Sequence, residues 1–463
     1  MNALSIVDAA AEQPNALALI ESGKHFSYED IANEAKQLIR KGHPESLDIV
    51  EPDLNRESFV RIAALLQERR PFALLHPRWT ETQKRDAIMR LRAEPEPNTT
   101  TIHEGDVVVF TSGSEAEPKA VVLSQAALEA AATAHFQNLP CATNERWLLS
   151  LPPAHIGGLS ILTRMIFSRG AVVLAESSKF NADEMLRTIE RDNVTTLSVV
   201  PTTLHRLVET GNRAPDSLRA VLVGGAPLLT TLQERAIALG YPVVTTYGCT
   251  ELASQICTQS LFEVGAAHVG RALNGIDIRI QHGEIQARGR SIMRGYLGRT
   301  VDSAFTADGW YATGDLAQVE ETGVVVVRGR VGDMIISGGE NVSPARVEAV
   351  AMNVQGVQQA VAFGIEDSQW GQTVALAIAA AADFDVGPLK VAIQHELAPY
   401  ERPKVWARFS EMPLNSNGKL DRRRIIREAM DGFGANAVDR KSCPTKFKPP
   451  TSSSCMPTFG AFQ

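Results

Sequence analysis

Residues 195–248 read TTLSVVPTTLHRLVETGNRAPDSLRAVLVGGAPLLTTLQERAIALGYPVVTTYG, in which β-branched apolar runs alternate with helix-like stretches. Runs that are apolar throughout predict strands buried on both faces, and intervening helices favour a parallel sheet. The same alternation extends over about residues 105–330, through DVVVF at 106–110 and AVVLAE at 171–176. We therefore predict a large α/β domain with doubly wound, mostly parallel sheets.

The pattern changes twice towards the C-terminus. Short strands with glycine turns over 283–327 predict a small barrel-like subdomain. After Arg330, the order helix, strand, strand, helix predicts a compact α+β unit. The last residues are rich in proline and serine and lack apolar periodicity, which predicts disorder. The predicted parts are an N-terminal domain of residues 1–330, a small C-terminal domain of 331–432 and a tail of 433–463.

The composition limits the classes of partner. The chain has 463 residues, 44% of them hydrophobic and 21% charged, which predicts a folded protein with a sizeable core. Its net charge of -7 argues against binding to nucleic acid or to an anionic membrane surface. The longest stretch without charge, residues 147–163, contains Pro152 and Pro153 and is not expected to span a bilayer. Small molecules are therefore the expected partners, and a homo-oligomer is left open.

Two features indicate a cytoplasmic protein. The first residues carry Asp8 and Glu12 within their apolar run and have no basic start, so no signal peptide is expected. The chain has an odd number of cysteines, widely spaced and without a CxxC pair, which argues against a disulfide framework and against structural zinc. These cysteines are Cys141, Cys249, Cys257, Cys443 and Cys455.

The segment TSGSEAEPKAV at 111–121 follows the predicted strand DVVVF directly. A turn rich in hydroxyls and glycine after a strand suits a phosphate, because several backbone N–H groups and a lysine can contact its oxygens. The alternative is an ordinary polar turn between a strand and a helix. The segment does not match GxxxxGK[ST], which disfavours a P-loop NTPase. The candidate phosphate contacts are Thr111, Ser112, Gly113, Ser114 and Lys119.

Further motifs follow this loop in a fixed order. They are LPPAHIGG at 151–158, VGGAPL at 223–228, TTYGCTE at 245–251, GWYATGD at 309–315, GRVGDMIISGGENVSPARVE at 329–348 and NSNGKLDR at 415–422. This ordered set resembles the acyl-adenylate-forming superfamily of acyl- and aryl-CoA ligases, luciferases and peptide-synthetase adenylation domains. The resemblance covers about residues 15–428. Within it, WLLSLPPAHIGGLSIL, IISGGENVSPARVE and the short region before the phosphate loop are most similar to bacterial o-succinylbenzoate-CoA ligases of menaquinone biosynthesis.

The resemblance implies a reaction in two halves. A carboxylate attacks the α-phosphate of ATP with Mg²⁺ present, and the thiol of coenzyme A then displaces AMP to give a thioester. It also implies a mobile C-terminal domain that carries Lys419, the cation for the first half. His155 is implied to lie at the border of the acyl pocket and the thiol channel, and the Thr250 hydroxyl to contact the α-phosphate.

The resemblance further assigns nucleotide contacts. Tyr247 is expected to stack on adenine, Glu251 to help hold Mg²⁺, Asp315 to accept from the ribose hydroxyls, and Arg330 to lie close by. Without this context, a Thr-Glu pair is more typical of a helix N-cap and a Gly-Asp pair of a plain turn. The remaining cofactor contacts that it implies are Gly224, Gly225, Ala226, Thr246 and Gly248 for the nucleotide, and Gly338 and Gly339 for pantetheine.

The sequence departs from the superfamily at three places, one of which is the proline- and cysteine-containing tail after Phe433. In the phosphate loop, Glu115 and Glu117 stand where hydroxyl and basic residues are usual, which predicts repulsion of the triphosphate. At the boundary between the domains, Gly332 stands where an Asp or Lys is common, which predicts a looser hinge.

The identity of the acid stays open at this point. An o-succinylbenzoate pocket must hold a second carboxylate, and the segments after LPPAHIGG and after TTLSVV supply its candidate donors. The alternatives are an aryl- or medium-chain acyl-CoA ligase, or a non-catalytic nucleotide-binding protein of the same fold. A peptide-synthetase domain is disfavoured because no carrier domain follows Lys419. The candidate donors are Arg164, Thr202, Thr203, His205 and Arg206.

Overall fold

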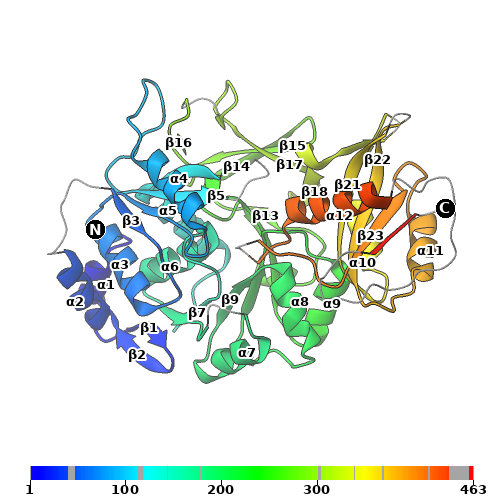
Figure 1. The fold of residues 1–463 in the computed structure, drawn as a ribbon. Coiled ribbons are helices and arrows are strands. Elements are labelled where there is room, and N and C mark those ends of the chain that lie inside the picture. The colour runs from blue at the N-terminus through cyan, green and yellow to red at the C-terminus, as the bar shows by residue number, and fades with distance from the viewer. Residues whose placement is uncertain are drawn as a thin grey trace. The chain divides into compact units, whose positions relative to one another are not determined.

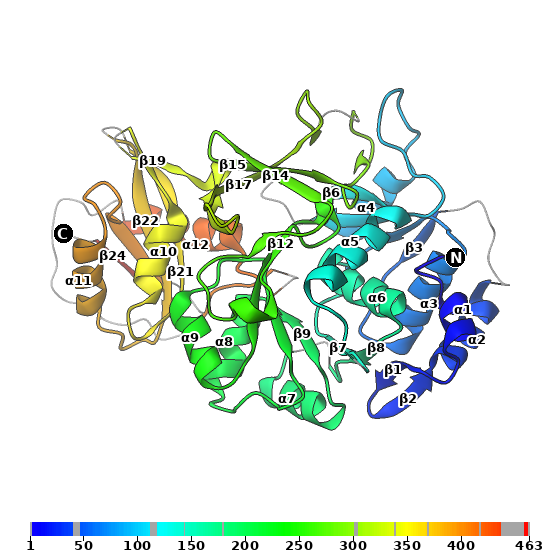
Figure 2. The ribbon, with the colours of Figure 1, turned by 180° about the vertical axis from the view of Figure 1, so that it is seen from behind.

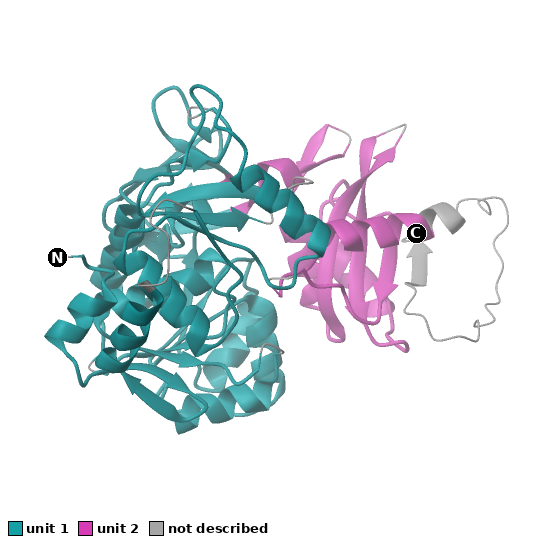
Figure 3. Ribbon diagram, turned by 60° about the vertical axis from the view of Figure 1, so that its left-hand side comes forward, with its two compact units in different colours: residues 1–313, 317–327 teal, residues 314–316, 328–463 magenta. Residues whose placement is uncertain are grey.

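A computed structural model describes most of the chain. The described residues are 2–39, 47–111, 118–142, 144–177, 180–300, 304–337, 339–367, 370–415, 418–436 and 458–461. They form two compact units, one of residues 1–313 and 317–327 and the other of 314–316 and 328–463 (Figure 3). The predicted boundary after Arg330 lies three residues beyond this division. The short segment Gly314–Leu316 was not anticipated, because a single strand runs through both units there.

Within the described residues, the larger sheet of unit 1 has nine strands in the order β13-β12-β11-β10-β9-β7-β8-β1-β2. The strands from β11 to β1 in this order are parallel to their neighbours, while β2, β12 and β13 add antiparallel edges. The prediction of a mostly parallel sheet from the apolar runs is confirmed. The bounds are β1 (Leu17–Glu21), β2 (Lys24–Ser27), β7 (Arg146–Leu149), β8 (Ala171–Leu174), β9 (Thr196–Val199), β10 (Ala220–Val223), β11 (Val243–Tyr247), β12 (Cys257–Thr258) and β13 (Arg271–Ala272).

A second sheet has the order β16-β6-β5-β4-β3, with β3, β4 and β5 parallel and β6 antiparallel to β5. DVVVF forms β5 as predicted. The chain after it returns as a strand rather than entering a helix, so the phosphate-loop segment connects a hairpin. The bounds are β3 (Asp48–Val50), β4 (Phe72–Leu74), β5 (Asp106–Thr111), β6 (Lys119–Ser124) and β16 (Gly295–Tyr296).

Helices cover both faces of the larger sheet (Figures 1 and 2). The apolar sides of α7, α8 and α9 pack on one face. Helices α3, α5 and α6 share the core with its other face and with the second sheet, whose outer face packs on α4. The bounds are α1 (Ile6–Glu12), α2 (Tyr28–Ile39), α3 (Arg56–Gln67), α4 (Glu81–Leu91), α5 (Gln125–Asn138), α6 (Ile156–Ser168), α7 (Ala182–Arg191), α8 (Pro201–Glu209) and α9 (Thr230–Ala238), with short 3₁₀ turns η1 (Thr250–Leu252) and η2 (Leu261–Glu263).

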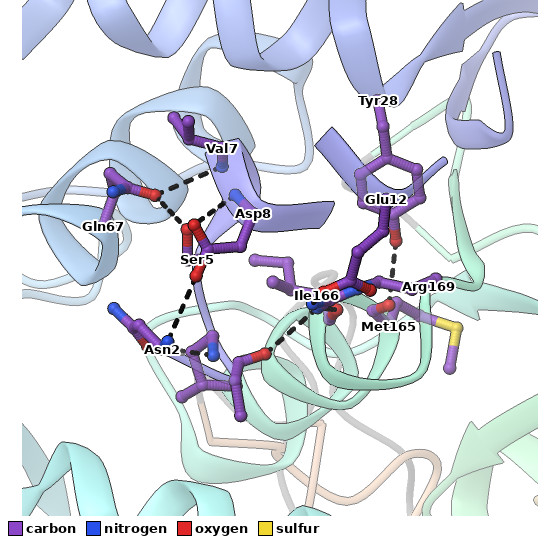
Figure 4. Close-up of polar contacts among 12 residues, drawn as sticks. Asn2, Ser5, Val7, Asp8, Glu12, Tyr28, Gln67, Met165, Ile166 and Arg169 are labelled. Carbon is purple, nitrogen blue, oxygen red and sulfur yellow. Dashed lines mark hydrogen bonds and ion pairs between the residues drawn. The ribbon is translucent and has the colours of Figure 1, made fainter. Parts of the chain in front are cut away.

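The C-terminal end of α6 is fixed by the N-terminal helices (Figure 4). The buried Tyr28 hydroxyl of α2 lies 2.9 Å from Met165 O and 2.7 Å from Gly170 O. Arg169 caps α6 in a left-handed conformation and pairs with Glu12 of α1 at 2.9 Å. These contacts fix the C-terminal end of α6, and they therefore also fix the positions of the residues along the helix.

The glycine-rich segment forms a third sheet in the order β14-β15-β17-β18. Strands β14 and β15 make an antiparallel hairpin, and β17 and β18 continue into unit 2. The bounds are β14 (Ile276–Gln281), β15 (Glu284–Gly289), β17 (Tyr311–Val319) and β18 (Val325–Arg330).

Unit 2 contains a sheet in the order β20-β19-β22-β23-β24, with β21 paired to β22. Helices α10 and α11 pack on one face and α12 on the other. The predicted order helix, strand, strand, helix is present as α10, β21, β22 and α11. The bounds are η4 (Val331–Asp333), β19 (Ile335–Ser337), β20 (Glu340–Val342), α10 (Pro344–Met352), β21 (Val357–Asp367), β22 (Gly371–Ala380), α11 (Gly387–Glu396), β23 (Val405–Phe409), α12 (Arg422–Asn436) and β24 (Thr458–Ala461).

The prediction of disorder from residue 433 onwards is wrong at both ends of the tail. Helix α12 continues to Asn436, and β24 pairs antiparallel with β23. The backbone groups of the β23 edge are available to any extended segment, and composition does not reveal such pairing. Residues 437–457 lie outside the described residues. Among the helices that the structure describes, none has the length and apolar character needed to cross a membrane.

Candidate active site

The predicted nucleotide and acyl segments of unit 1 follow β7, β9, β10 and β11. These four strands run parallel, so their carboxyl ends lie at one edge of the larger sheet. Ligands of open α/β sheets bind at this edge, where the loops leave the strands. The fold therefore brings the segments at 151–158, 200–206, 224–226 and 248–251 together.

The turn after β10 lies against the end of β11. A Cβ atom at Gly224 would lie 2.8 Å from Thr246 Cγ2 and 2.9 Å from Thr246 O, so only glycine fits there. Gly225 has a φ of +79°, and Gly225 and Ala226 are exposed. The turn thus presents open backbone, which suits the approach of a flat ring.

The turn after β11 is equally tight. A Cβ at Gly248 would lie 1.6 Å from Ser254 O, which excludes any side chain at this position. The half-buried Tyr247 precedes this glycine, and its carbonyl accepts the Ile256 N–H at 2.8 Å. Thr250 follows as the first residue of η1. The structure therefore places Tyr247 and Thr250 on the two sides of a glycine turn, and their roles in stacking and phosphate contact stay predictions.

Glu251 is buried, with 8% of its surface exposed. Tyr296 donates its hydroxyl hydrogen bond to Glu251 Oε1 at 2.8 Å, and the Tyr296 and Tyr311 hydroxyl oxygens are 3.3 Å apart. Burial raises the pKa of both tyrosines, so they remain protonated donors. Lys119 Nζ lies 5.2 Å from the centroid of the Tyr296 ring. One tyrosine thus connects the loop lysine with the predicted Mg²⁺ carboxylate.

The phosphate loop is described only at its ends. Thr111 closes β5 directly opposite Lys119 at the start of β6. Arg90 of α4 donates to Pro118 O at 2.9 Å, which fixes the chain just before Lys119. The other predicted contacts, Ser112, Gly113 and Ser114, lie outside the described residues together with Glu115 and Glu117.

Glu251 suits a magnesium ion whose other ligands are substrate phosphates and waters. Among the described residues, no three His, Cys, Asp or Glu side chains group as a metal site. Mg²⁺ is usually held by one or two carboxylates together with substrate phosphates and waters. Glu251, with one oxygen bonded to Tyr296, supplies such a single carboxylate beside Lys119.

His155 begins α6 as its N-cap and is half-buried. Its ring packs on that of His76, with centroids 4.9 Å apart and planes tilted by 39°. His76 follows β4, and burial together with nearby Arg78 lowers the pKa of its imidazole to about 4. Sequence reasoning missed His76, because nothing around it in LLHPRW marks it as a partner of a residue 79 positions away.

Arg164 lies on α6 and is 3% exposed. Its guanidinium lies 5.5 Å from the centroid of the Trp147 ring, and burial lowers the pKa of Arg164 to about 9. Within the part of the chain that is described, its Nε and Nη2 atoms are buried without a hydrogen-bond partner. A buried guanidinium whose nitrogens lack hydrogen-bond partners destabilises the folded protein unless an anion pairs with it.

Of the other predicted donors for a second carboxylate, Arg206 and His205 have contacts of their own. Arg206 stacks over Phe180 at 5.6 Å, and His205 Nδ1 lies 4.0 Å from Glu209 of the same helix. Thr202 and Thr203 lie in the first turn of α8 and are half-buried. Arg164 is therefore the strongest of these candidates.

A polar chain missed at the sequence level connects the surroundings of Arg164 with β11. The ring of His135 lies 5.1 Å from that of Trp147, and its Nδ1 lies 2.8 Å from Gln255 Oε1. Gln255 Nε2 donates to Thr246 Oγ1 at 3.1 Å. Burial holds the pKa of His135 well below its usual value. The predicted nucleotide residue Thr246 is thus fixed by a neutral, buried network.

Unit 2 brings its three predicted residues together. Arg330 Nε pairs with Asp315 Oδ1 at 3.0 Å. Burial and the neighbouring Arg330 lower the pKa of Lys419, while Asp315 acts in the opposite direction. Lys419 is held in a turn, where its N–H donates to Asn415 Oδ1 at 3.1 Å and its carbonyl accepts from Asn415 N at 2.7 Å. A positioned lysine thus lies near a carboxylate–guanidinium pair, and the roles of the three residues stay predictions.

The remaining predictions in unit 2 concern glycines. Gly339 has a φ of +86° in the turn between β19 and β20, and it is exposed. Gly332 lies in η4 with open space around its Cβ position. Gly338 lies outside the described residues. An exposed glycine turn agrees with an approach to an extended ligand, and the pantetheine role stays a prediction.

Comparisons with known families agree with this geometry. The model of the AMP-binding enzyme family matches residues 48–297, and that of the AMP-binding enzyme C-terminal domain matches residues 346–419. A 2-succinylbenzoate–CoA ligase of Bacillus pumilus is 30% identical over 468 residues, covering 89% of this chain and 95% of that protein. A ligase of the same name from Staphylococcus epidermidis is 34% identical over 333 residues, 70% of each.

Solved structures are similar over most of the chain. The o-succinylbenzoate CoA synthetase from Bacillus subtilis with the acyl-adenylate intermediate has a TM-score of 0.81 and 27% identity, covering 91% of this chain and 97% of that one. The same synthetase in complex with ATP and a magnesium ion has a TM-score of 0.82 and 26% identity, covering 92% and 99%.

Proposed function

This chain belongs to the family of AMP-binding enzymes, and from this premise we propose that it is an ATP- and Mg²⁺-dependent acid–CoA ligase acting on 2-succinylbenzoate in menaquinone biosynthesis. Relatives that carry the name of this ligase cover most of the chain, and similar structures hold ATP, magnesium and the acyl-adenylate. The acid attacks the α-phosphate of ATP and releases pyrophosphate. The thiol of CoA then attacks the acyl carbon and releases AMP.

The nucleotide roles of the unit 1 residues follow from the carboxyl edge of the larger sheet. Gly224, Gly225 and Ala226 offer backbone to the base, on which Tyr247 stacks. Thr250, at the start of η1, donates its hydroxyl to the α-phosphate. Asp315, acceptor-only when ionised, takes the ribose hydroxyls, and Arg330 fixes its orientation.

Charge on the phosphates would be balanced by Lys119 and by a magnesium ion held at Glu251, and both residues contact Tyr296. Glu251 would hold Mg²⁺, which when bound neutralises phosphate charge and positions the leaving pyrophosphate. Lys119 supplies a further cation at the end of the phosphate loop. Tyr296, a protonated donor, orients the carboxylate so that its second oxygen serves the ion.

Lys419 is the proposed cation of the first half-reaction. Attack of one anion on another is opposed by Coulomb repulsion, and a positioned ammonium offsets it. The turn that holds Lys419 through Asn415 limits its backbone freedom, so little reorganisation is needed when the charge develops.

The single observation that carries the choice of acid is the buried Arg164. 2-Succinylbenzoate has an aromatic carboxylate besides the succinyl carboxylate that is activated. A guanidinium that is 3% exposed, with two nitrogens lacking a partner in the described structure, fits that second anion. A benzoate or a fatty acid brings no second charge and would leave the cation buried and unpaired.

A panel of acids tests this function. Thioester formation and pyrophosphate release are measured with 2-succinylbenzoate, 4-phenylbutyrate and benzoate. A site built to pair a buried charge rejects analogues lacking it by about 10⁴-fold, so kcat/KM should favour 2-succinylbenzoate by several orders of magnitude. An equal or higher value for a monocarboxylic acid would contradict the choice of acid and leave the ligase activity intact.

We also propose a cytoplasmic location, because ATP and CoA are the co-substrates. Its partners are these two and the acid. The role of His155 at the border of the acyl pocket and the thiol channel is part of the same proposal.

A further inference from the structure

The turn that holds Lys419 leads directly into helix α12. The Asp421 N–H donates to Pro413 O at 2.9 Å, which closes the turn, and the partly buried Leu420 packs on the apolar core below α12. Helix α12 begins at the next residue, Arg422. Because Arg422 is the third residue after Lys419, the place where α12 begins limits where the lysine can lie.

The side chain of Arg422 connects this start of α12 to two other elements. Its Nη1 donates to Glu348 Oε1 of α10 at 2.6 Å, and its Nη2 donates to Ala362 O of β21 at 2.8 Å. Glu348 is 8% exposed, and the same Oε1 accepts the Ala362 N–H at 2.8 Å. The carboxylate and the guanidinium therefore pair with each other and with the backbone of one residue, and hydrogen bonds to charged groups are the stronger ones.

This ion pair joins the two helical layers of unit 2 around a strand. Helix α10 packs on one face of the sheet and α12 on the other. Between them, β21 pairs antiparallel with β22, with Ala362 opposite Leu376. The N–H and C=O of one residue in such a strand point to the same edge, and those of Ala362 both meet the ion pair. Glu348 and Arg422 thus fix α10, β21 and the start of α12 relative to one another.

The chemistry of the pair suits a role in geometry. A buried ion pair contributes little net stability, because desolvation of the two charges offsets much of their attraction. A guanidinium is planar, however, and it fixes the directions of both of its hydrogen bonds. Arg422 therefore sets the position of the chain beside Lys419 more sharply than an apolar side chain would.

We propose that Arg422, held by Glu348, is a positioning residue for Lys419 in the first half-reaction. The inference rests on the proposed function, which makes Lys419 the cation for adenylation. A misplacement of about 1 Å can cost about 10²-fold in rate, so loss of this anchor lowers adenylation although Arg422 itself contacts no substrate.

Arg422→Met removes both hydrogen bonds and keeps an apolar stem. The kcat of adenylation, followed by pyrophosphate release, is expected to fall by about tenfold or more, whereas thioester formation from supplied acyl-adenylate stays within about twofold. Arg424→Met is the matched control, because Arg424 lies on the same helix and pairs with Glu428 at 2.7 Å on the surface. The control should keep both half-reactions. A purely structural role of Arg422 would lower both by the same factor.

A double-mutant cycle with Lys419→Ala completes the test. Arg422→Met should lower adenylation by less than about twofold when Lys419 is already alanine, because the group that it positions is absent. If Arg422→Met does not fold, Arg422→Lys takes its place. A lysine keeps the charge but lacks the planar fork that reaches Glu348 and Ala362 together, so a loss of about threefold or more is expected, again in adenylation alone.

Equal losses in the two half-reactions, equal losses with and without Lys419, or the same adenylation rate in Arg422→Met and Arg424→Met would overturn the role of Arg422. A wild-type enzyme that forms neither adenylate nor thioester from any acid would instead contradict the proposed function, on which this role depends.

Discussion

The hydroxyl of Tyr296 lies 2.8 Å from Glu251 Oε1. The two residues come from β16 in the second sheet and from η1 after the larger sheet. This hydrogen bond therefore joins the edges of two sheets at the proposed Mg²⁺ carboxylate. Lys119 over the same ring completes a group of opposite charges around one aromatic side chain.

Tyr296→Phe removes the donor that orients Glu251. Loss of a partner that orients a metal ligand typically costs about 10- to 100-fold in metal affinity or activity, so we expect the apparent Mg²⁺ requirement of adenylation to rise in that range. Tyr311→Phe is the matched control, because its hydroxyl lies 3.3 Å from that of Tyr296 and, within the described part of the chain, makes no hydrogen bond to Glu251. Equal effects of the two variants would show that the hydrogen bond to Glu251 is not the cause.

Lys419→Ala should separate the two half-reactions. Removing one positioned charge contact lowers adenylation by about 10²- to 10³-fold, whereas thioester formation from supplied acyl-adenylate is largely kept. The exposed Lys404 in the same unit serves as the control for loss of a surface charge. Lys419 does not have the proposed role if both half-reactions fall equally.

The phosphate loop gives a prediction from sequence alone. Glu115→Thr with Glu117→Lys removes two negative charges and adds one positive charge. A unit charge about 6–8 Å away is worth roughly 2–3 kcal/mol at an effective dielectric of about 20 before screening, so the KM for ATP at low salt should fall. An unchanged KM would indicate that these side chains point away from the nucleotide.

Tyr28→Phe tests how α6 is anchored. Its hydroxyl is buried against Met165 O and Gly170 O. In the variant, Met165 O keeps the backbone N–H groups of Arg169 and Gly170, whereas Gly170 O loses the hydroxyl. Leaving a buried carbonyl without this donor costs about 1–3 kcal/mol, so the urea midpoint of unit 1 should decrease. Tyr400→Phe is the control, because Tyr400 is 43% exposed. Equal midpoints for the two variants would show that the anchor contributes nothing.

Much of the fold could be predicted from the sequence, because a strand or helix is marked by the pattern of the residues within it. Runs such as 106–110 and 171–176 are apolar throughout, since both faces of their strands are covered, and they form β5 and β8. The return of the chain as β6 was not predicted, because one strand does not reveal the direction of the next. Strand β24 was also missed, since its pairing depends on the edge of β23.

The candidate site was predictable where motifs are contiguous. Glu251 in YGCTE and Asp315 in ATGD could be found through the resemblance, and the structure places Glu251 beside Tyr296 and Asp315 beside Arg330. Contacts between distant segments carry no local pattern. Tyr296, His76 and His135 were missed for this reason, because packing of separate elements brings them to the site.

The most direct test of the proposed function is the preference for the dicarboxylic acid in Arg164→Met. The methionine fills similar apolar volume over Trp147 but cannot pair with an anion. Arg206→Met, on the other side of the larger sheet, is the matched control. Both variants are compared with the wild type by the ratio of kcat/KM for 2-succinylbenzoate to that for 4-phenylbutyrate.

Truncating one partner of a buried charge pair costs about 2–5 kcal/mol, so the ratio should fall by about 10²- to 10³-fold in Arg164→Met and stay unchanged in Arg206→Met. A ratio that is unchanged in Arg164→Met would contradict the assignment of Arg164 as the site of the second carboxylate.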